Sequence, residues 1–210
     1  MGLAMRLRRL GCLTTLISVV VGCSHMTSGA AVRQPFIGED KCSAVPAPMT
    51  MIEPQRSGEP IMRIPRPKNW ERSTMLDSEL IRYAMANADI AANNFAPSAL
   101  VTLEDVTTHR GSPEEIFDME WEGLVNLAGG TDLVTTSDSP VCGFPAQRVT
   151  FALPRMGAIP PRKGTAIAVV TTGVRKYAAV VGLQATQPEN PAYVDDANDI
   201  LDGFQIMTDQ

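Results

Sequence analysis

The fold class is clearest in the stretch TAIAVVTTGVRKYAAVVGLQAT, residues 165–186. It contains two runs rich in alanine and valine, residues 165–172 and 176–186, on either side of a short segment with Gly173. Short apolar runs that flank a glycine turn are typical of paired strands. We therefore predict two antiparallel strands joined as a hairpin around Gly173.

Two helices are predicted on either side of this hairpin. Ser112, Pro113 and Glu115 are typical of a helix N-terminus, because Ser112 can cap the first turn and Glu115 can complete a capping box. That helix should end at Gly129, and a second should begin at Pro191. The apolar residues expected to face inward are Phe117, Trp121, Leu124 and Ala128 in the first helix, and Tyr193, Ala197, Ile200, Leu201 and Phe204 in or after the second.

Further strands are predicted where apolar and polar residues alternate. These segments are residues 61–64, 80–86, 99–106, 132–136 and 146–153. Strands that outnumber two separated helices indicate an α+β domain. The expected fold is an antiparallel β-sheet flanked by helices.

The first 22 residues have the composition of an export signal. Arg6, Arg8 and Arg9 precede an apolar run over residues 10–21, and this order is typical of a signal peptide. The run is too short to cross a bilayer as a helix, which takes about 20 apolar residues. We expect a cleaved signal rather than a transmembrane anchor.

The residues that follow indicate the kind of signal. Val20-Val21-Gly22-Cys23 resembles the lipobox of bacterial lipoproteins, in which the cysteine takes a diacylglycerol and a peptidase cuts before it. The resemblance implies lipidation of Cys23 and attachment to the extracytoplasmic face of the cell membrane. Two or more acyl chains, such as palmitate, hold a protein there stably. An ordinary secretory signal, with Cys23 at this place by chance, is the alternative.

Charge and composition set limits on the mature protein. Removal of residues 1–22 takes away three arginines and no acidic residue, so the formal charge of the chain changes from −5 to −8. An acidic chain lacks the basic stripe that nucleic-acid binders need. Residues 23–58 show no sustained periodicity and are expected to be the lipidated N-terminus and a flexible stalk. The domain would then comprise residues 59–210.

Two cysteines remain once Cys12 leaves with the signal and Cys23 carries lipid. Cys42 and Cys142 are expected to form a disulfide, because an isolated pair favours this state in an oxidising compartment. The bond would close a loop of about 100 residues and stabilise the fold by up to ~4.7 kcal/mol in the chain-entropy model. Two buried free thiols are the alternative. A zinc site is disfavoured, because two cysteines without nearby histidines do not complete a tetrahedral shell.

Seven ordered segments of the mature chain carry a family resemblance. They are residues 58–65 (GEPIMRIP), 70–72 (WER), 76–82 (LDSELIR), 95–99 (FAPSA), 142–146 (CGFPA), 184–191 (QATQPENP) and 200–204 (ILDGF). Together they resemble the mycobacterial LpqN/LpqT lipoprotein family, over nearly all of the mature chain from about Cys42 onward.

The resemblance implies a PsbP-like α/β/α sandwich and a place in the cell envelope. It also implies association with the transport of mycolate-type lipids, such as trehalose mycolate, by envelope transporters. It supplies no catalytic residue. Two functions are therefore expected as alternatives: a non-catalytic accessory protein that binds an envelope lipid, or a protein-interaction module tethered beside a transporter that binds no lipid itself.

Residues that could carry catalysis are few. A Ser-His-Asp triad of an envelope esterase would have to use His109, because His25 lies two residues past the expected anchor, and no Gly-x-Ser-x-Gly elbow is present. Paired carboxylates of the glycosidase kind are better explained as a solvated helix face. Those carboxylates are Glu114, Glu115, Asp118, Glu120 and Glu122. We expect a protein that is not an enzyme and that uses no cofactor or metal.

Two further patterns bear on ligands. Asp195, Asp199 and Asp202 recur on one helical face, but the glycine and glutamate of an EF-hand loop are not in place, so solvation is expected rather than calcium binding. The methionines of the domain are expected to be ordinary core. The alternative is that their adaptable side chains line a lipid-accepting cavity with its mouth at residues 93–100 and 155–164. The methionines of the domain are Met62, Met75, Met85, Met119, Met156 and Met207.

Overall fold

The computed structural model describes residues 39–208, so the expected signal peptide and Cys23 lie outside the described residues. The elements in chain order are η1 (Glu39–Lys41), β1 (Met49–Ile52), β2 (Ile61–Pro65), β3 (Glu71–Arg72), β4 (Ile81–Ala86), η2 (Ala88–Ile90), β5 (Ser98–Asp105), α1 (Pro113–Ala128), β6 (Thr131–Ser137), β7 (Ala146–Leu153), β8 (Arg162–Val170), β9 (Tyr177–Ala185), α2 (Pro191–Asp202) and β10 (Gln205–Met207). None of the helices in this range has the length and apolar character needed to cross a bilayer.

A seven-stranded antiparallel sheet forms the centre of the domain, in the order β3-β4-β5-β9-β8-β7-β6. The predicted hairpin around Gly173 is confirmed, since β8 and β9 pair in register from Lys163 with Ala185 to Val170 with Ala178. Strand β8 begins at Arg162, three residues before the expected start. The other predicted strands are all present, with ends that differ by a residue or two.

A second sheet of three strands, in the order β1-β2-β10, was not predicted. Ile52 of β1 pairs with Met62 of β2, and Ile206 of β10 pairs with the same residue from the other side. The expected stalk, residues 23–58, therefore contributes a strand to the domain, and the boundary at residue 59 was placed too late. Four residues of β1 are too few to show a period in the sequence, although Ile52 is buried by this pairing.

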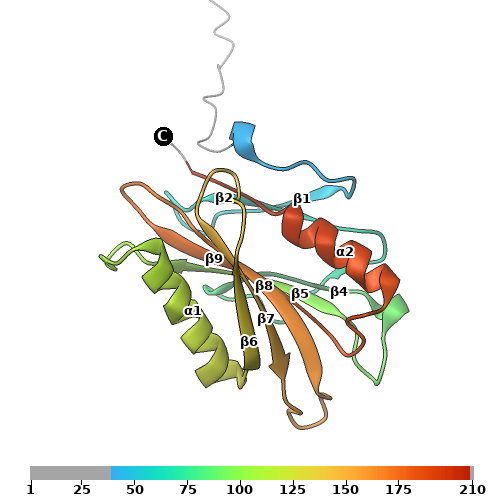
Figure 1. The fold of residues 1–210 in the computed structure, drawn as a ribbon. Coiled ribbons are helices and arrows are strands. Elements are labelled where there is room, and N and C mark those ends of the chain that lie inside the picture. Colours follow the sequence, from blue (N-terminus) through green and yellow to red (C-terminus); the bar gives the residue numbers. More distant parts are fainter. Residues whose placement is uncertain (1–38, 209–210) are drawn as a thin grey trace, which may run out of the picture. The chain divides into compact units, whose positions relative to one another are not determined.

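The two helices cover opposite faces of the large sheet (Figure 1). Side chains of α1 pack with Val149, Ala168 and Val170, whereas those of α2 pack with Ile167 and Val169. Neighbouring residues of a strand point to opposite faces of the sheet, so Ala168 and Val170 lie on one face and Ile167 and Val169 lie on the other. The two helices therefore pack on opposite faces of the sheet. The small sheet lies on the α2 side, because Met62 and Ile206 belong to the same core as α2. The α/β/α arrangement expected from the sequence is confirmed.

Helix ends follow local chemistry. Ser112 and Glu115 form the predicted capping box at the start of α1, and Gly129 ends the helix with a φ of 71°, a conformation that glycine adopts without strain. In α2 the cap is Asn190, whose side chain accepts a hydrogen bond from the backbone N–H of Ala192.

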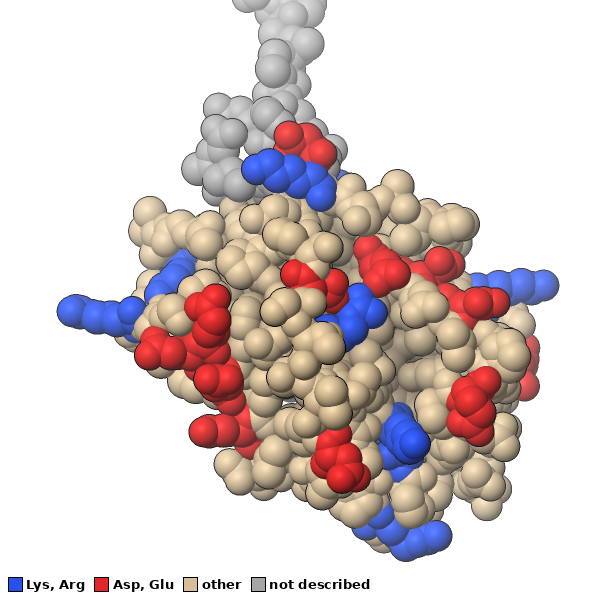
Figure 2. All heavy atoms as spheres, viewed as in Figure 1, with Lys and Arg blue, Asp and Glu red and all other residues tan. Residues whose placement is uncertain are grey.

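The surface of α1 is acidic. Its sequence contains five carboxylates and no lysine or arginine, and Figure 2 shows acidic side chains gathered over this helix. Glu114 and Glu115 lie in the first turn, where negative charge is favoured by the helix dipole.

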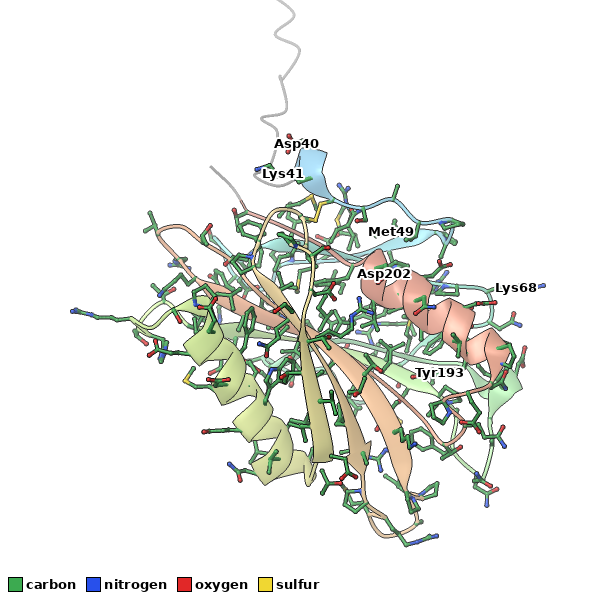
Figure 3. All side chains as sticks on the ribbon, viewed as in Figure 1. Asp40, Lys41, Met49, Lys68, Tyr193 and Asp202 are labelled. Atoms are coloured by element: carbon green, nitrogen blue, oxygen red, sulfur yellow. A yellow bond between two sulfur atoms is a disulfide. The ribbon has the colours of Figure 1, made fainter. Side chains whose placement is uncertain are left out.

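The disulfide expected between Cys42 and Cys142 is present, and it joins residues 100 positions apart (Figure 3). Cys42 follows η1, and Cys142 lies in the loop between β6 and β7. Cys142 is 3% exposed and packs in the core on the α2 side. The bond therefore ties the segment before β1 to the body of the domain.

Candidate binding groove beside helix α2

An open groove of 690 Å³ runs between α2 and the strands β7 and β8. Residues from the sheet, from α2 and from the loop before α2 line it. They are Asp132, Arg148, Thr150, Phe151, Ala152, Lys163, Gly164, Thr165, Pro188, Tyr193, Val194, Ala197, Asn198 and Leu201.

The wall formed by α2 is mainly apolar. Tyr193, Ala197 and Leu201 recur at intervals of four, so they share one face of the helix, and each is buried. Val194 lies beside them and is 38% exposed. Sequence periodicity predicted three of these four residues to face inward, which the structure confirms, but it did not show that the same face borders a groove.

Strands β7 and β8 form the floor. Arg148, Thr150 and Ala152 alternate along β7, and Thr150 pairs with Thr165 of β8. Lys163 lies opposite Ala152, four positions along the floor from Arg148. The floor is therefore polar in its middle and has a cation near each end.

Tyr193 adds a hydroxyl to the apolar wall. It is 5% exposed and lies on the side of α2 that faces the sheet (Figure 3). Burial raises the pKa of Tyr193 to about 12. Its phenol therefore stays protonated at physiological pH, and it can donate or accept a hydrogen bond without bringing charge to the groove.

Two acidic residues hold Arg148 at the floor. Its Nε donates to Oδ2 of Asp138 at 2.7 Å, and its Nη2 donates to Oδ1 of Asp202 at 2.8 Å. Burial alone would lower the pKa of Arg148, but the hydrogen bonds to Asp202 and Asp138 outweigh it and raise the pKa. Arg148 thus remains charged and fastens the last residue of α2 to β7.

Two acidic residues of α2 have structural partners. Asp196 accepts a hydrogen bond of 2.7 Å from the indole of Trp70, and Asp202 is held by Arg148. Asp195 is exposed. Over residues 39–208, no three acidic, histidine or cysteine side chains lie together as metal ligands. The structure thus gives two of the carboxylates a role in fixing α2 to its neighbours.

His109 lies apart from the groove, at a shallow hollow by the start of α1. The hollow is bordered by acidic side chains of that helix, and no serine is among its lining residues in the described part of the chain. Glu120, farther along α1, is half-buried; burial, with a smaller effect of the Glu104 carboxylate, raises the pKa of Glu120 to about 7.

The expectation that methionines are ordinary core holds for the three that are buried, whereas the alternative of a methionine-lined cavity is wrong in its placement. Met62, Met85 and Met207 are at most 1% exposed and belong to ordinary core, and no methionine borders the α2 groove among the residues described. Residues 93–100 do not contribute to it either, whereas Lys163 and Gly164, within the second expected segment, do. Methionine composition carries no positional information, which is why it misplaced the groove.

Known proteins share the fold of this chain. LpqN of Mycobacterium tuberculosis, described as involved in cell envelope biogenesis, superposes with a TM-score of 0.58 at 18% identity, over 76% of this chain and 91% of LpqN. No protein-family model matches the sequence, and neither does any curated protein. The likeness supports a distant relationship in fold, and does not show membership of the LpqN/LpqT family.

Two other structures show weaker likeness. Cyanobacterial PsbP from Synechocystis has a TM-score of 0.48 at 12% identity, over 79% of this chain and 96% of its own. The Ran-binding protein Mog1p from Saccharomyces cerevisiae has a TM-score of 0.47 at 13% identity, over 76% and 95% respectively.

Proposed function

We propose that this chain is a lipid-anchored accessory protein of the cell envelope, which binds an amphiphile in the groove beside α2 and catalyses no reaction. The observation that carries the proposal is the composition of the groove: an apolar wall on α2 faces a polar floor with Arg148 and Lys163 near its ends. The likeness in fold to LpqN, a protein of envelope biogenesis, supports the setting.

The groove has the size and chemistry for an amphiphile. Its 690 Å³ lies within the range of about 300–1,000 Å³ that is typical of small-molecule sites. An acyl chain would pack against Val194 and Leu201, while hydroxyl head groups would bind Thr150 and acidic head groups would bind Lys163. A glycolipid such as trehalose mycolate combines these two parts.

The anchor is the second element of the proposal. Lipid at Cys23 would hold the domain at the outer side of the cell membrane, near envelope lipids. In cells, Cys23→Ala is expected to release the protein from membranes or to leave it with an uncleaved signal. A mutant that is normally processed and fully membrane-bound would contradict lipidation.

Ligand binding is tested by native mass spectrometry of the full chain purified from its own cells. The wild type should carry a co-purifying amphiphile. Val194→Asp and Thr150→Trp place a charge or a bulky ring in the groove at exposed positions, and should each reduce the bound fraction at least about tenfold. Leu127→Asp is the matched control, since Leu127 is a 90% exposed apolar residue of α1 outside the groove.

The opposite result would identify the alternative. If neither co-purifying nor added amphiphile binds, the lipid-binding proposal fails. A protein-interaction module tethered beside a transporter would then account for the chain. Crosslinking in cells would test this alternative: a membrane protein should be captured as a partner, equally by the wild type and by Val194→Asp.

A further inference from the structure

A second hollow, of 460 Å³, lies between β1 and the paired strands β3 and β4. It shares no residue with the groove beside α2. Its lining contains three arginines and one tyrosine; the residues are Thr50, Met51, Ile52, Glu53, Pro54, Gln55, Arg66, Arg72, Arg82 and Tyr83.

A β-bulge places two adjacent side chains at this hollow. In the pairing of β4 with β5, Ile81 lies opposite Thr102 and Tyr83 opposite Val101, so Arg82 is an extra residue. Side chains of adjacent strand residues normally point to opposite faces, and a bulge changes this by bending the strand. Arg82 and Tyr83 both line the hollow, although they are neighbours in sequence.

Each of these two residues has a buried donor without a partner among residues 39–208. The groups are Nε of Arg82 and the hydroxyl of Tyr83, on side chains of residues that are 6% and 4% exposed. The Nε group can only donate a hydrogen bond, and the hydroxyl can donate one. Two buried donors left unpaired are costly, and they call for an acceptor.

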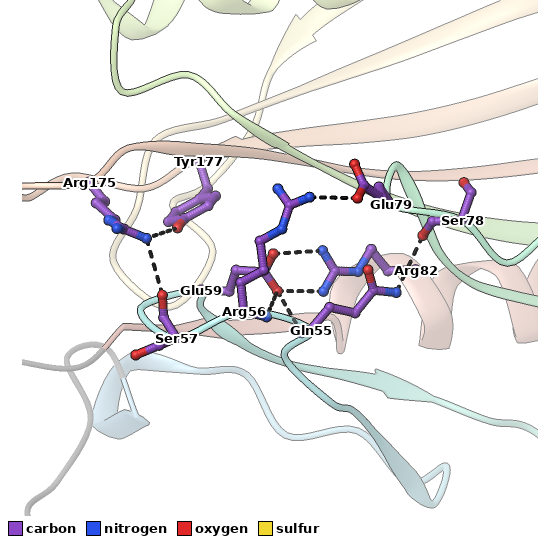
Figure 4. Close-up of polar contacts among 9 residues, drawn as sticks. All are labelled: Gln55, Arg56, Ser57, Glu59, Ser78, Glu79, Arg82, Arg175 and Tyr177. Atoms are coloured by element: carbon purple, nitrogen blue, oxygen red, sulfur yellow. Dashed lines mark hydrogen bonds and ion pairs between the residues drawn. The ribbon is translucent and has the colours of Figure 1, made fainter.

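Glu59 is not that acceptor, because its carboxylate accepts hydrogen bonds from the other two nitrogens of the Arg82 guanidinium (Figure 4). Its two oxygens accept from Nη1 and Nη2 of Arg82 at 3.1 and 2.5 Å, and from the backbone N–H groups of Gln55 and Arg56. The hydrogen bond from Arg82, with smaller contributions from those N–H groups, lowers the pKa of Glu59 despite burial. The pair is thus a fixed support that leaves Nε of Arg82 for a ligand.

The charge at the hollow favours a single negative charge. Arg82 is neutralised by Glu59, and Arg72 by Asp77, to which it donates at 2.7 and 2.8 Å. The Arg66 side chain makes no ion pair within the part of the chain that the structure describes, so its positive charge can pair with a ligand. The exposed Glu53 carboxylate at the rim has no ion pair in that part either, and its negative charge opposes a multiply charged anion. The Arg72 guanidinium also lies 4.4 Å from the centre of the Tyr83 ring, and this contact holds the ring in place.

We infer that this hollow binds a monocarboxylate, whose two oxygens accept hydrogen bonds from Nε of Arg82 and from the Tyr83 hydroxyl. Two donors match the two oxygens of one carboxylate, and the charge of Arg66 matches its single negative charge. Phosphate, with a higher charge at neutral pH and more oxygens, is a poorer match for one unpaired arginine. Glu53, exposed at the rim, disfavours a second negative charge further.

Ligand-observed saturation-transfer NMR and thermal shift on the full chain in detergent test this inference, with benzoate as the probe. Benzamide is its neutral isostere, and inorganic phosphate tests the competing anion. Benzoate should bind saturably and raise the Tm, whereas benzamide and phosphate should bind at least about tenfold more weakly. Equal binding of benzamide, stronger binding of phosphate, or no saturable benzoate binding would overturn the inference.

Variants distinguish a role of Tyr83 in ligand binding from a purely structural role. Tyr83→Phe removes only the hydroxyl and should weaken benzoate about tenfold while leaving the unliganded Tm equal or higher. Tyr177→Phe, in the same core but outside the hollow, is its control. Arg66→Gln should weaken benzoate at least about threefold, with exposed Arg155→Gln as its control. Unchanged affinity in Tyr83→Phe would refute the site; substitution of Arg82 is avoided because it would leave Glu59 buried without its partner.

Discussion

Nε1 of Trp70 donates a hydrogen bond of 2.7 Å to Oδ2 of Asp196, and so joins the segment before β3 to the middle of α2. Trp70 is 2% exposed, which makes its N–H dependent on this acceptor. Together with the ion pair between Asp202 and Arg148, the bond fixes α2 at two points along its length. The wall of the groove beside α2 is therefore held by side chains that do not themselves form its apolar surface.

Loss of the acceptor should destabilise the fold. Asp196→Ala leaves the buried N–H of Trp70 unpaired, and we expect the free energy of unfolding to fall by about 1–3 kcal/mol. Chemical denaturation measures this. Asp195→Ala, at the exposed neighbour on the same helix, should change it by no more than about 0.5 kcal/mol. Equal effects of the two substitutions would mean that the hydrogen bond contributes nothing.

The contact between Trp70 and Asp196 also shows which features of this domain can be predicted from the sequence and which cannot. Helix and strand patterns predicted the large sheet and both helices, because periodicity and caps such as Ser112 act over a few residues. The partner of Asp196 lies 126 positions away in sequence. A single sequence contains no signal for such a contact. The sequence therefore predicted that all the aspartates of this helix are solvated.

Stability should depend on pH through Glu120. Because its pKa is raised to about 7 from 4.5, the folded state binds its proton more tightly than the unfolded state. The stability that this provides is complete below pH 4.5 and is lost as pH rises through about 7. Glu120→Gln should raise the free energy of unfolding at pH 8 by up to about 3 kcal/mol, with little change at pH 4. Denaturation curves at the two pH values check this, and a benefit that is equal at both would contradict the raised pKa.

The buried pair of Glu59 and Arg82 should make stability depend on pH in the opposite direction to Glu120. Its side chains are 7% and 2% exposed, so Glu59→Gln leaves a buried guanidinium without its counter-charge and should cost roughly 3 kcal/mol at neutral pH. The pKa of Glu59 is lowered, so its contribution is present above pH 4.5 and is lost as pH falls below that value. Urea denaturation should show that the free energies of unfolding of Glu59→Gln and the wild type differ less at pH 3 than at pH 7.

A matched control lies nearby on the surface. Glu79 pairs with Arg56 at 2.7 Å, but the two side chains are 82% and 64% exposed. Glu79→Gln should therefore change the free energy of unfolding by about 0.5 kcal/mol or less. If it costs as much as Glu59→Gln, burial is not the source of the effect.

The candidate sites were less predictable than the fold. Val194 and Thr150 line one groove only because α2 lies beside β7 and β8 in the folded domain. The hollow with Arg66, Arg82 and Tyr83 depends on a bulge and on the unpredicted strand β1. Each site joins segments distant in sequence. Local periodicity therefore predicted which residues of α2 face inward, but not what they face.

The disulfide allows a test of how the segment before β1 is held. Reduction of the bond between Cys42 and Cys142, or the double substitution Cys42→Ser and Cys142→Ser, restores the freedom of a 100-residue loop in the unfolded chain. We expect a loss of roughly 3–5 kcal/mol in the free energy of unfolding, since a long loop gains most from closure. Thermal unfolding with and without reductant measures this. The double-serine chain serves as control and should not respond to reductant; a wild-type Tm that reductant leaves unchanged would show that the bond does not stabilise the domain.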